Sequence, residues 1–303
     1  MSPRVDVHHH VLPPQFVDST PMPVSVPDPE TQLRTMQGFG IEVAITSLTP
    51  RVLTGDIARR VAVARACNDF QAQLIGDHPA RFGGLAMLPL PHIDACLEEV
   101  TYALDQLHLD GIGVYSSTDG IYLGDAHYEP LLEELNRRHC VVFVHPTHCA
   151  APPELNLGAP AGILEYVVDT SRAILNMLHT GWVRRFPDVR WIFSHAGGTI
   201  PFLTHRISGL GQDAVPDLKR LNYDVASAMG PHALRSLQEL VPAEQILWGS
   251  DLPFVYGQRL QHEIDEWEAY DGLDAASREA VERHNALRLF SEVAARASAG
   301  VTR

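Results

Sequence analysis

Short apolar runs alternate along the chain with longer stretches of helical periodicity. The apolar runs predict eight β-strands, at 4–10, 41–47, 82–88, 111–115, 140–145, 189–195, 221–226 and 245–250. The intervening stretches have apolar spacing near 3.6 and are long enough to cross between parallel strands, at 57–76, 93–107, 128–138, 161–185, 200–209 and 232–240. Eight such βα units over this length predict an α/β fold, a distorted (β/α)8 or TIM barrel.

The same pattern favours one domain over residues 1–303, because the chain has no internal repeat and no Gly/Ser linker. A Pro-rich segment at about 13–30 is predicted to form a long first loop over the barrel mouth. Helical patterns at 260–270 and 275–297 follow the eighth strand. We expect these C-terminal helices to complete the outer ring.

The first strand carries three consecutive histidines between valines. Because alternate side chains of a strand share a face, Asp6, His8 and His10 are expected on one side and His9 on the other. Imidazoles two residues apart can both reach one metal ion. An expression-tag remnant or a solvated histidine cluster would also contain such residues, but a tag would not lie between strand valines such as Val7 and Val11.

Three further polar residues end other predicted strands. His145 ends the run 141–144, His195 ends 191–194, and Asp251 follows 246–250. Any one of them could be an ordinary capping or hydrogen-bonded residue. Active sites of such barrels lie at the C-terminal ends of the strands. With His8 and His10, these three residues make five polar groups at the C-terminal ends of predicted strands. Together they therefore predict a functional site.

Three imidazoles and one carboxylate form a ligand set suited to a single divalent metal, in which zinc is expected and manganese or iron is possible. The predicted ligands are His8, His10, His145 and Asp251. His195 could act as an acid or base beside the metal or serve as another ligand. The pattern alone leaves that choice open.

Composition favours a small-molecule partner. The 303 residues include 23 basic and 37 acidic side chains, for a net charge of -14, with 45% hydrophobic and 20% charged residues. This acidic balance argues against nucleic acid and against a membrane surface. The N-terminus lacks the apolar segment of a signal peptide, and no apolar run has the length of a membrane span. We expect a soluble, cytoplasmic protein.

Several motifs together resemble the amidohydrolase superfamily, and within it the nonoxidative decarboxylases of the aminocarboxymuconate-semialdehyde and γ-resorcylate type. Finer stretches look closest to 6-methylsalicylate decarboxylase-like members. The motifs carrying the superfamily resemblance are the D-x-H-x-H strand (6–10), the His-Pro-Thr turn (145–147), S-H-A-G-G-T-I-P-F (194–202) and G-S-D-L-P-F (249–254), and the finer stretches are 122–125, 132–138 and 142–148.

The resemblance implies roles for individual residues. His8 and His10 match the paired ligands, His145 the third and Asp251 the last, while His195 matches a histidine that takes part in catalysis. Strand four ends at Tyr115 and Ser116 without the lysine that bridges two metals in other amidohydrolases, so a mononuclear site is expected. Family members are commonly dimers, which makes a homodimer the expectation.

Substrate contacts are less well marked. The arginines that grip the substrate carboxylate in the muconate-semialdehyde enzymes have no clear counterpart, and Arg51 is the nearest candidate by position. It could equally be a solvated loop arginine. Tyr115, Phe202 and Phe254 could line an aromatic pocket or be ordinary core residues.

The expected function is metal-dependent, nonoxidative decarboxylation of a small, salicylate-like hydroxyaromatic acid. The catalytic candidates are His195 and Asp251, either of which could deliver the proton. The alternative is a hydrolase that uses the same metal to activate water against an amide, lactone or imine. A third hypothesis is a noncatalytic metal-binding barrel, against which the intact set of polar groups argues.

Overall fold

The structure is a computed structural model. It describes residues 3–17, 26–49, 52–147, 160–209 and 213–301.

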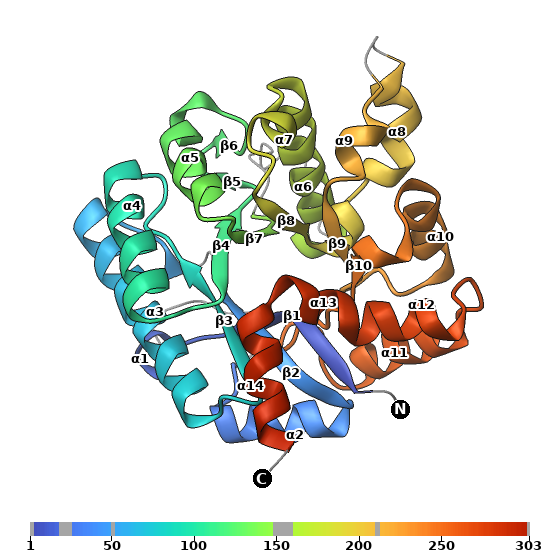
Figure 1. The fold of residues 1–303 in the computed structure, drawn as a ribbon, viewed down its shortest axis with the longest axis horizontal. Helices are drawn as coiled ribbons and strands as arrows, with labels where there is room; N and C mark the ends of the chain where they lie inside the picture. Colours follow the sequence, from blue (N-terminus) through green and yellow to red (C-terminus); the bar gives the residue numbers. More distant parts are fainter. Residues whose placement is uncertain (1–2, 18–25, 50–51, 148–159, 210–212, 302–303) are drawn as a thin grey trace.

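Eight parallel strands form the centre of the molecule, and helices surround them (Figure 1). Each predicted apolar run contains one strand, which confirms the (β/α)8 architecture. In sheet order the strands are β1 (Arg4–Val11), β2 (Ile41–Leu48), β3 (Phe82–Met87), β4 (Gly111–Tyr115), β7 (Val141–His145), β8 (Arg190–Phe193), β9 (Asn222–Asp224) and β10 (Ile246–Leu247). A small hairpin, β5 (Ser117–Thr118) and β6 (Ile121–Tyr122), follows β4.

Backbone hydrogen bonds between β1 and the segment after β10 close the barrel. The Val7 N–H donates to the carbonyl of Trp248 at 3.1 Å, and the His10 N–H donates to that of Leu252 at 2.7 Å. The Asp251 N–H donates to the carbonyl of His8 at 2.8 Å. The closure therefore brings the first and last predicted motifs side by side.

Most helices lie where the sequence predicted them. The segment at 161–185 is split where Gly181 adopts φ 74. The helix α2 was not predicted, although Asp28 caps its Thr31 N–H and proline occupies its first turn. The helices are α1 (Pro14–Val17), α2 (Pro29–Gly38), α3 (Ile57–Asp77), α4 (Ile93–Thr101), α5 (Glu129–Arg137), α6 (Ala161–His179), α7 (Trp182–Arg185), α8 (Ile200–Ser208), α9 (Val215–Leu218), α10 (Pro231–Leu240), α11 (Gln258–Ala269), α12 (Ala275–Glu279), α13 (Asn285–Leu289) and α14 (Ser291–Val301).

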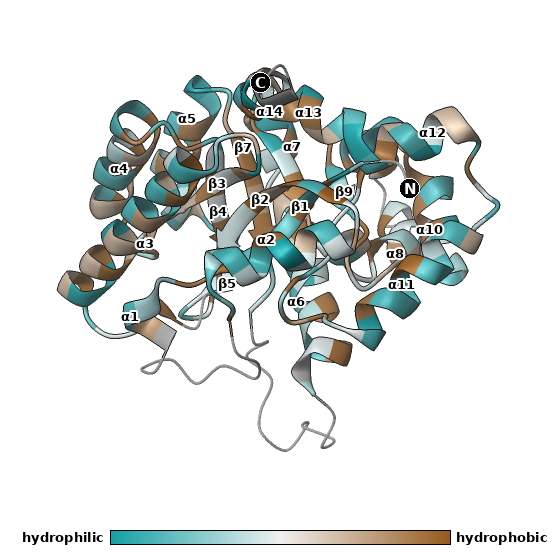
Figure 2. Ribbon diagram, turned by 90° about the horizontal axis from the view of Figure 1, so that it is seen from below, coloured by the Kyte–Doolittle hydropathy of each residue, from teal (hydrophilic) through white to brown (hydrophobic). Residues whose placement is uncertain are grey.

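The last C-terminal helices also cover one end of the barrel, which the sequence pattern did not predict. Val293 of α14 and Phe290, which lies between α13 and α14, pack against the apolar interior of the barrel together with other side chains of these helices. The interior is formed by residues such as Val7, Phe143 and Ile192. Figure 2 shows these helices at the opposite end of the molecule from α1 and the start of α6. One end of the barrel is therefore filled and covered, because burying these apolar surfaces stabilises the fold.

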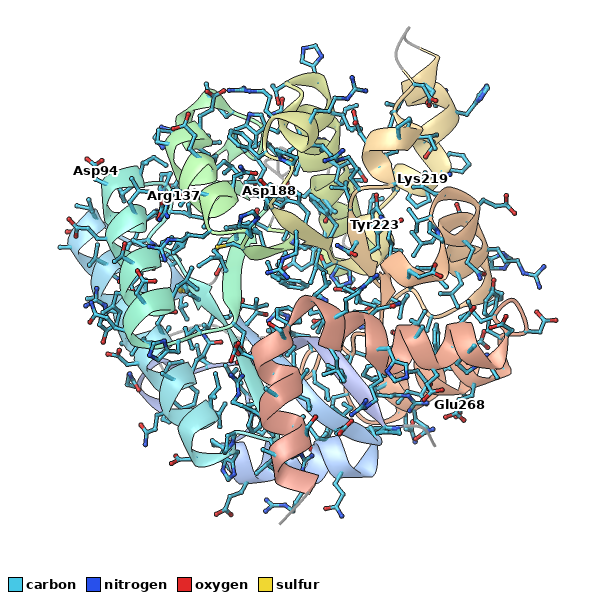
Figure 3. The ribbon with its side chains drawn as sticks, viewed as in Figure 1. Asp94, Arg137, Asp188, Lys219, Tyr223 and Glu268 are labelled. Atoms are coloured by element: carbon cyan, nitrogen blue, oxygen red, sulfur yellow. The ribbon has the colours of Figure 1, made fainter. Side chains whose placement is uncertain are left out.

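A second apolar layer lies between the strands and the outer helices, as a barrel requires. Charged side chains such as Asp94, Arg137 and Glu268 lie at the periphery, whereas Tyr223, in strand β9 of the sheet, is fully buried (Figure 3). Within the described residues, no helix is both long enough and apolar enough to cross a membrane.

Candidate metal centre

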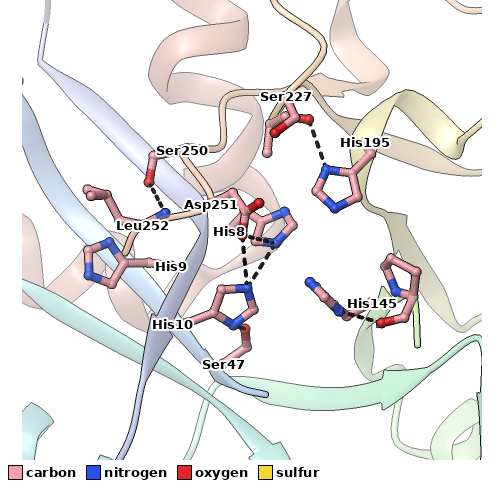
Figure 4. A network of polar contacts seen from close by, with 12 residues as sticks. His8, His9, His10, Ser47, His145, His195, Ser227, Ser250, Asp251 and Leu252 are labelled. Carbon is pink, nitrogen blue, oxygen red and sulfur yellow. Dashed lines mark hydrogen bonds and ion pairs between the residues drawn. The ribbon is translucent and has the colours of Figure 1, made fainter. Parts of the chain in front are cut away.

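His8 and His10 lie near the end of β1 and direct their rings to one side. Their Nε2 atoms are 3.1 Å apart, and both side chains are fully or almost fully buried. Figure 4 shows the two rings facing a common space with His145 and Asp251. The predicted alternation therefore holds for these two histidines.

His145 and Asp251 complete the cluster from β7 and from the turn after β10. One ligand-type atom from each of His8, His10, His145 and Asp251 lies within 4.8 Å of all the others. The Asp251 Oδ1 is 3.5 Å from His8 Nε2 and 3.3 Å from His10 Nε2. These residues are far apart in the sequence, and the closed barrel brings them together.

The second ring nitrogen of each histidine is already engaged. His8 Nδ1 donates to Asp224 Oδ2 at 2.8 Å, and His145 Nδ1 donates to the carbonyl of Pro146 at 2.7 Å. His10 Nδ1 lies 3.2 Å from Ser47 Oγ. Such partners fix the orientation of a metal-binding histidine and leave Nε2 free for the ion.

The donor set fits a divalent cation. Asp251 Oδ1 is buried and has no hydrogen-bond partner among the described residues. Tetrahedral zinc ligands about 2.1 Å from the ion would lie about 3.4 Å from one another, close to the separations between His8, His10 and Asp251.

Electrostatics of the cluster keep its carboxylate ionised. Burial alone would raise the pKa of Asp251, but its close contact with His10 Nε2 at 3.3 Å and the charge of His8 hold that pKa below its usual range. Burial opposes charge on His8 as well, yet Asp224 raises the His8 pKa to about 9. For His145, burial and the neighbouring imidazoles hold the pKa well below its ordinary value. The Asp251 carboxylate is thus anionic, and His8 must release a proton from Nε2 before all three imidazoles can act as donors.

His195 lies beside the cluster, with its ring centroid 4.9 Å from that of His8 and 5.8 Å from that of His145. Its Nδ1 donates to the carbonyl of Ala226 at 3.0 Å, so Nε2 is the nitrogen that can accept or donate a proton. His195 and Asp251 have φ values of 54° and 59°. Such strained backbone conformations in residues other than glycine concentrate at functional sites.

Asp224 is the main polar residue that the sequence analysis missed. It is fully buried at the end of β9, where one oxygen binds His8 and the other accepts the backbone N–H groups of His195 at 2.9 Å and Ala226 at 3.0 Å. The available signal was a single charged residue inside the apolar run 221–226. Gly249 permits this arrangement, because a Cβ there would lie 2.8 Å from the Cβ of His8.

The predicted substrate contacts have different positions. The ring centroid of Phe254 lies 5.0 Å from that of His10, edge to face. Tyr115 instead packs in the core between barrel and helices, and its hydroxyl donates to the carbonyl of Leu48 at 3.2 Å. Arg51 lies outside the described residues.

Phe202 requires a correction, because the structure does not bring it to the cluster. It lies on α8 with 81% of its surface exposed, in a surface groove between α8 and α10 whose lining includes no residue of the metal cluster. A different aromatic residue, Tyr166 on α6, lies near the cluster, with its ring centroid 6.2 Å from that of His145. Its position within an amphipathic helical pattern had given no sign of this.

Comparison with known proteins places these residues in a family. The family model described as amidohydrolase matches residues 5–291. Decarboxylase yanB of Aspergillus niger is 32% identical over 95% of this chain and 87% of its own. The 6-methylsalicylic acid decarboxylase of Penicillium expansum is 30% identical over 95% of this chain and 96% of its own.

A solved structure agrees in fold. The crystal structure of an amidohydrolase II has a TM-score of 0.90 and 28% sequence identity, and the match covers 95% of this chain and 99% of that one. The family match extends from β1, which carries His8 and His10, past Asp251 to the start of α14. The chain therefore belongs to the amidohydrolase family.

Proposed function

We propose that this protein is a metal-dependent, nonoxidative decarboxylase of a small aromatic acid that carries a hydroxyl group ortho to its carboxylate. The observation that carries the proposal is the buried cluster of His8, His10, His145 and Asp251 with His195 beside it. Similarity over nearly the whole chain to a 6-methylsalicylic acid decarboxylase supports the choice of reaction.

In this proposal the four clustered residues hold one divalent ion, and His195 stays outside its coordination sphere. Zinc is our first choice, with manganese as the second, because three imidazoles and a carboxylate suit both. When bound, the ion supplies positive charge that orients the substrate carboxylate and ortho hydroxyl.

The chain's own residues must then deliver a proton to the ring carbon that bears the carboxylate. Protonation at that carbon avoids an aryl carbanion and forms a dearomatised ring. Cleavage of the bond to the carboxylate returns its electron pair to the ring, restores aromaticity and releases carbon dioxide. His195 Nε2 is one candidate donor, since its Nδ1 is fixed by the carbonyl of Ala226. Asp251 is the other, and because its carboxylate is held ionised it must first take up the proton that it delivers.

Phe254 and Tyr166 would form apolar walls for the aromatic ring. Their ring centroids lie 5.0 Å from that of His10 and 6.2 Å from that of His145, respectively. Aromatic side chains favour offset or edge-to-face contacts with a bound ring. Arg51 remains a proposed contact for the substrate carboxylate on the basis of its sequence position.

The test is to incubate the metal-loaded protein with ortho-hydroxy aromatic acids, including 6-methylsalicylate, and to measure released carbon dioxide. In deuterated water we expect one deuterium at the vacated ring carbon. Hydrolysis of amide or lactone substrates without carbon dioxide release from any acid would refute the decarboxylase assignment and favour a hydrolase. A homodimer and a cytoplasmic location remain predictions, supported by the family resemblance and by the sequence respectively.

A further inference from the structure

His9 lies between two residues of the metal cluster, yet its ring is on the other side of β1 (Figure 4). It is 2% exposed, and both of its ring nitrogens are engaged. Nδ1 lies 3.1 Å from Asp6 Oδ2, and Nε2 lies 3.1 Å from Gln32 Oε1. Both partners are buried, so the imidazole is held within the barrel wall.

Asp6 connects His9 to the turn after β10. Its Oδ1 accepts the backbone N–H of Ser250 at 2.9 Å, and its Oδ2 accepts the Ser250 hydroxyl at 2.5 Å. This corrects the expectation that Asp6 faces the same way as His8 and His10. The cause is a β-bulge, in which Asp6 pairs with Ala44 but His9 pairs with Thr46.

Ser250 immediately precedes Asp251, whose backbone has the strained φ of 59°. The Ser250 hydroxyl oxygen also accepts the N–H of Leu252 at 3.0 Å, so both neighbours of Asp251 are fixed through one side chain. A strained conformation persists only where its surroundings hold it. The contacts that hold Ser250 therefore help to determine where the Asp251 carboxylate lies.

The geometry points to His9 as a positioning residue for the metal centre. We propose that its Nδ1 contact holds Asp6 against Ser250, and thereby keeps the Asp251 carboxylate facing His8 and His10. The Nε2 contact with Gln32 holds the ring in place, but it does not determine the position of the Asp251 carboxylate. This inference rests on the proposed function in one respect, the assignment of Asp251 as a metal ligand.

Two substitutions separate the contacts of His9. The amide nitrogen of asparagine can replace Nδ1, so His9→Asn retains the contact with Asp6 and loses the one with Gln32. His9→Gln reaches toward the Nε2 position and loses the contact with Asp6. His179→Gln, at an exposed position on α6, controls for the exchange itself.

The readouts are zinc affinity, by competition with a chromophoric chelator, and kcat and KM for carbon dioxide release. We expect His9→Gln to weaken zinc binding and lower kcat by about tenfold or more, with KM within about twofold, as is usual when a residue behind a metal ligand is lost. His9→Asn should remain within about threefold of the parent in both quantities. His179→Gln should match the parent.

Equal effects of the two His9 substitutions would overturn the proposal. So would parental zinc affinity and parental kcat in His9→Gln with only a lower Tm, because that result describes a residue that supports folding alone. If His9→Gln does not fold, Asp6→Asn provides the test: an amide nitrogen in place of Oδ2 cannot accept from His9 Nδ1, while the remaining oxygen still accepts the backbone N–H of Ser250, and the same losses are expected. Parental protein that binds zinc but decarboxylates nothing would refute the proposed function, while the zinc affinities would still decide the role of His9.

Discussion

Asp224 accepts a hydrogen bond from His8 Nδ1 at 2.8 Å, with both side chains fully buried. The other oxygen of the same carboxylate accepts the backbone N–H of His195 at 2.9 Å. One carboxylate thus orients a proposed metal ligand and a proposed proton donor. The position of His8 relative to His195 therefore depends on Asp224.

Asp224→Asn should therefore impair both metal binding and turnover. The amide can still accept from His8, but its nitrogen cannot accept from the backbone of His195. We expect losses of about 10- to 100-fold in zinc affinity or kcat, measured by chelator competition and by carbon dioxide release. Asp188→Asn, at an exposed carboxylate, is the control. Parental values in both assays for Asp224→Asn would contradict this role.

The proposed ligands can be tested without any substrate. His10→Ala and His145→Ala should each lose bound metal, because three donors would then remain of a buried set of four. Elemental analysis of the purified variants gives the answer, with His179→Ala as a control for histidine loss at the surface. Full metal occupancy in either variant would remove that residue from the ligand set.

His195→Ala should have the opposite profile. Metal content should remain at the parental level, whereas kcat should fall by about 10²- to 10⁴-fold, the usual range for loss of a general acid or base. Elemental analysis and initial rates of carbon dioxide release check the two halves of this prediction. Loss of metal would instead make His195 a ligand, and unchanged kcat would leave Asp251 as the proton donor.

Acid stability should depend in part on Glu134 of α5. Hydrogen bonds from Arg137 and Arg138 lower its pKa to about 2, although burial opposes this. Its stabilising contribution is thus fully present above the ordinary pKa of 4.5 and is lost as pH falls toward 2. Since the group is partly exposed, the contribution should be below about 1 kcal/mol.

Urea unfolding of the parent and of Glu134→Gln measures this contribution at pH 6 and pH 3. The difference in free energy of unfolding between the two proteins should shrink at the lower pH. A difference that stays constant across this range would show that the ionised carboxylate is not its source.

The sequence pattern predicted the barrel because its eight apolar runs are separated by long helical stretches. It also identified His8, His10, His145 and Asp251 as a group, because each lies at or directly after the end of such a run. The location of polar groups at one end of a barrel follows from topology alone. That part of the site required no knowledge of side-chain packing.

The parts that were missed depend on contacts between distant segments. The bulge that turns Asp6 toward Ser250 cannot be derived from strict alternation, which treats β1 as regular. In the sequence, Asp224 is a single polar residue in a short apolar run, and only the closed barrel brings it into contact with His8. Phe202 shared the apolar pattern of α8, yet its side chain faces outward. Aromatic character alone does not tell a pocket wall from a surface residue.

The packing of α13 and α14 against the barrel interior affects how substrate could enter the proposed enzyme and how products could leave it. Phe290 and Val293 fill the end opposite the histidines together with apolar strand residues such as Val7 and Phe143. A close-packed interior offers no channel wide enough for a small molecule. For the proposed reaction we therefore expect the acid, the ring product and carbon dioxide to pass at the histidine end of the barrel, because the described residues fill the other end, and the ring product must leave before the next acid binds.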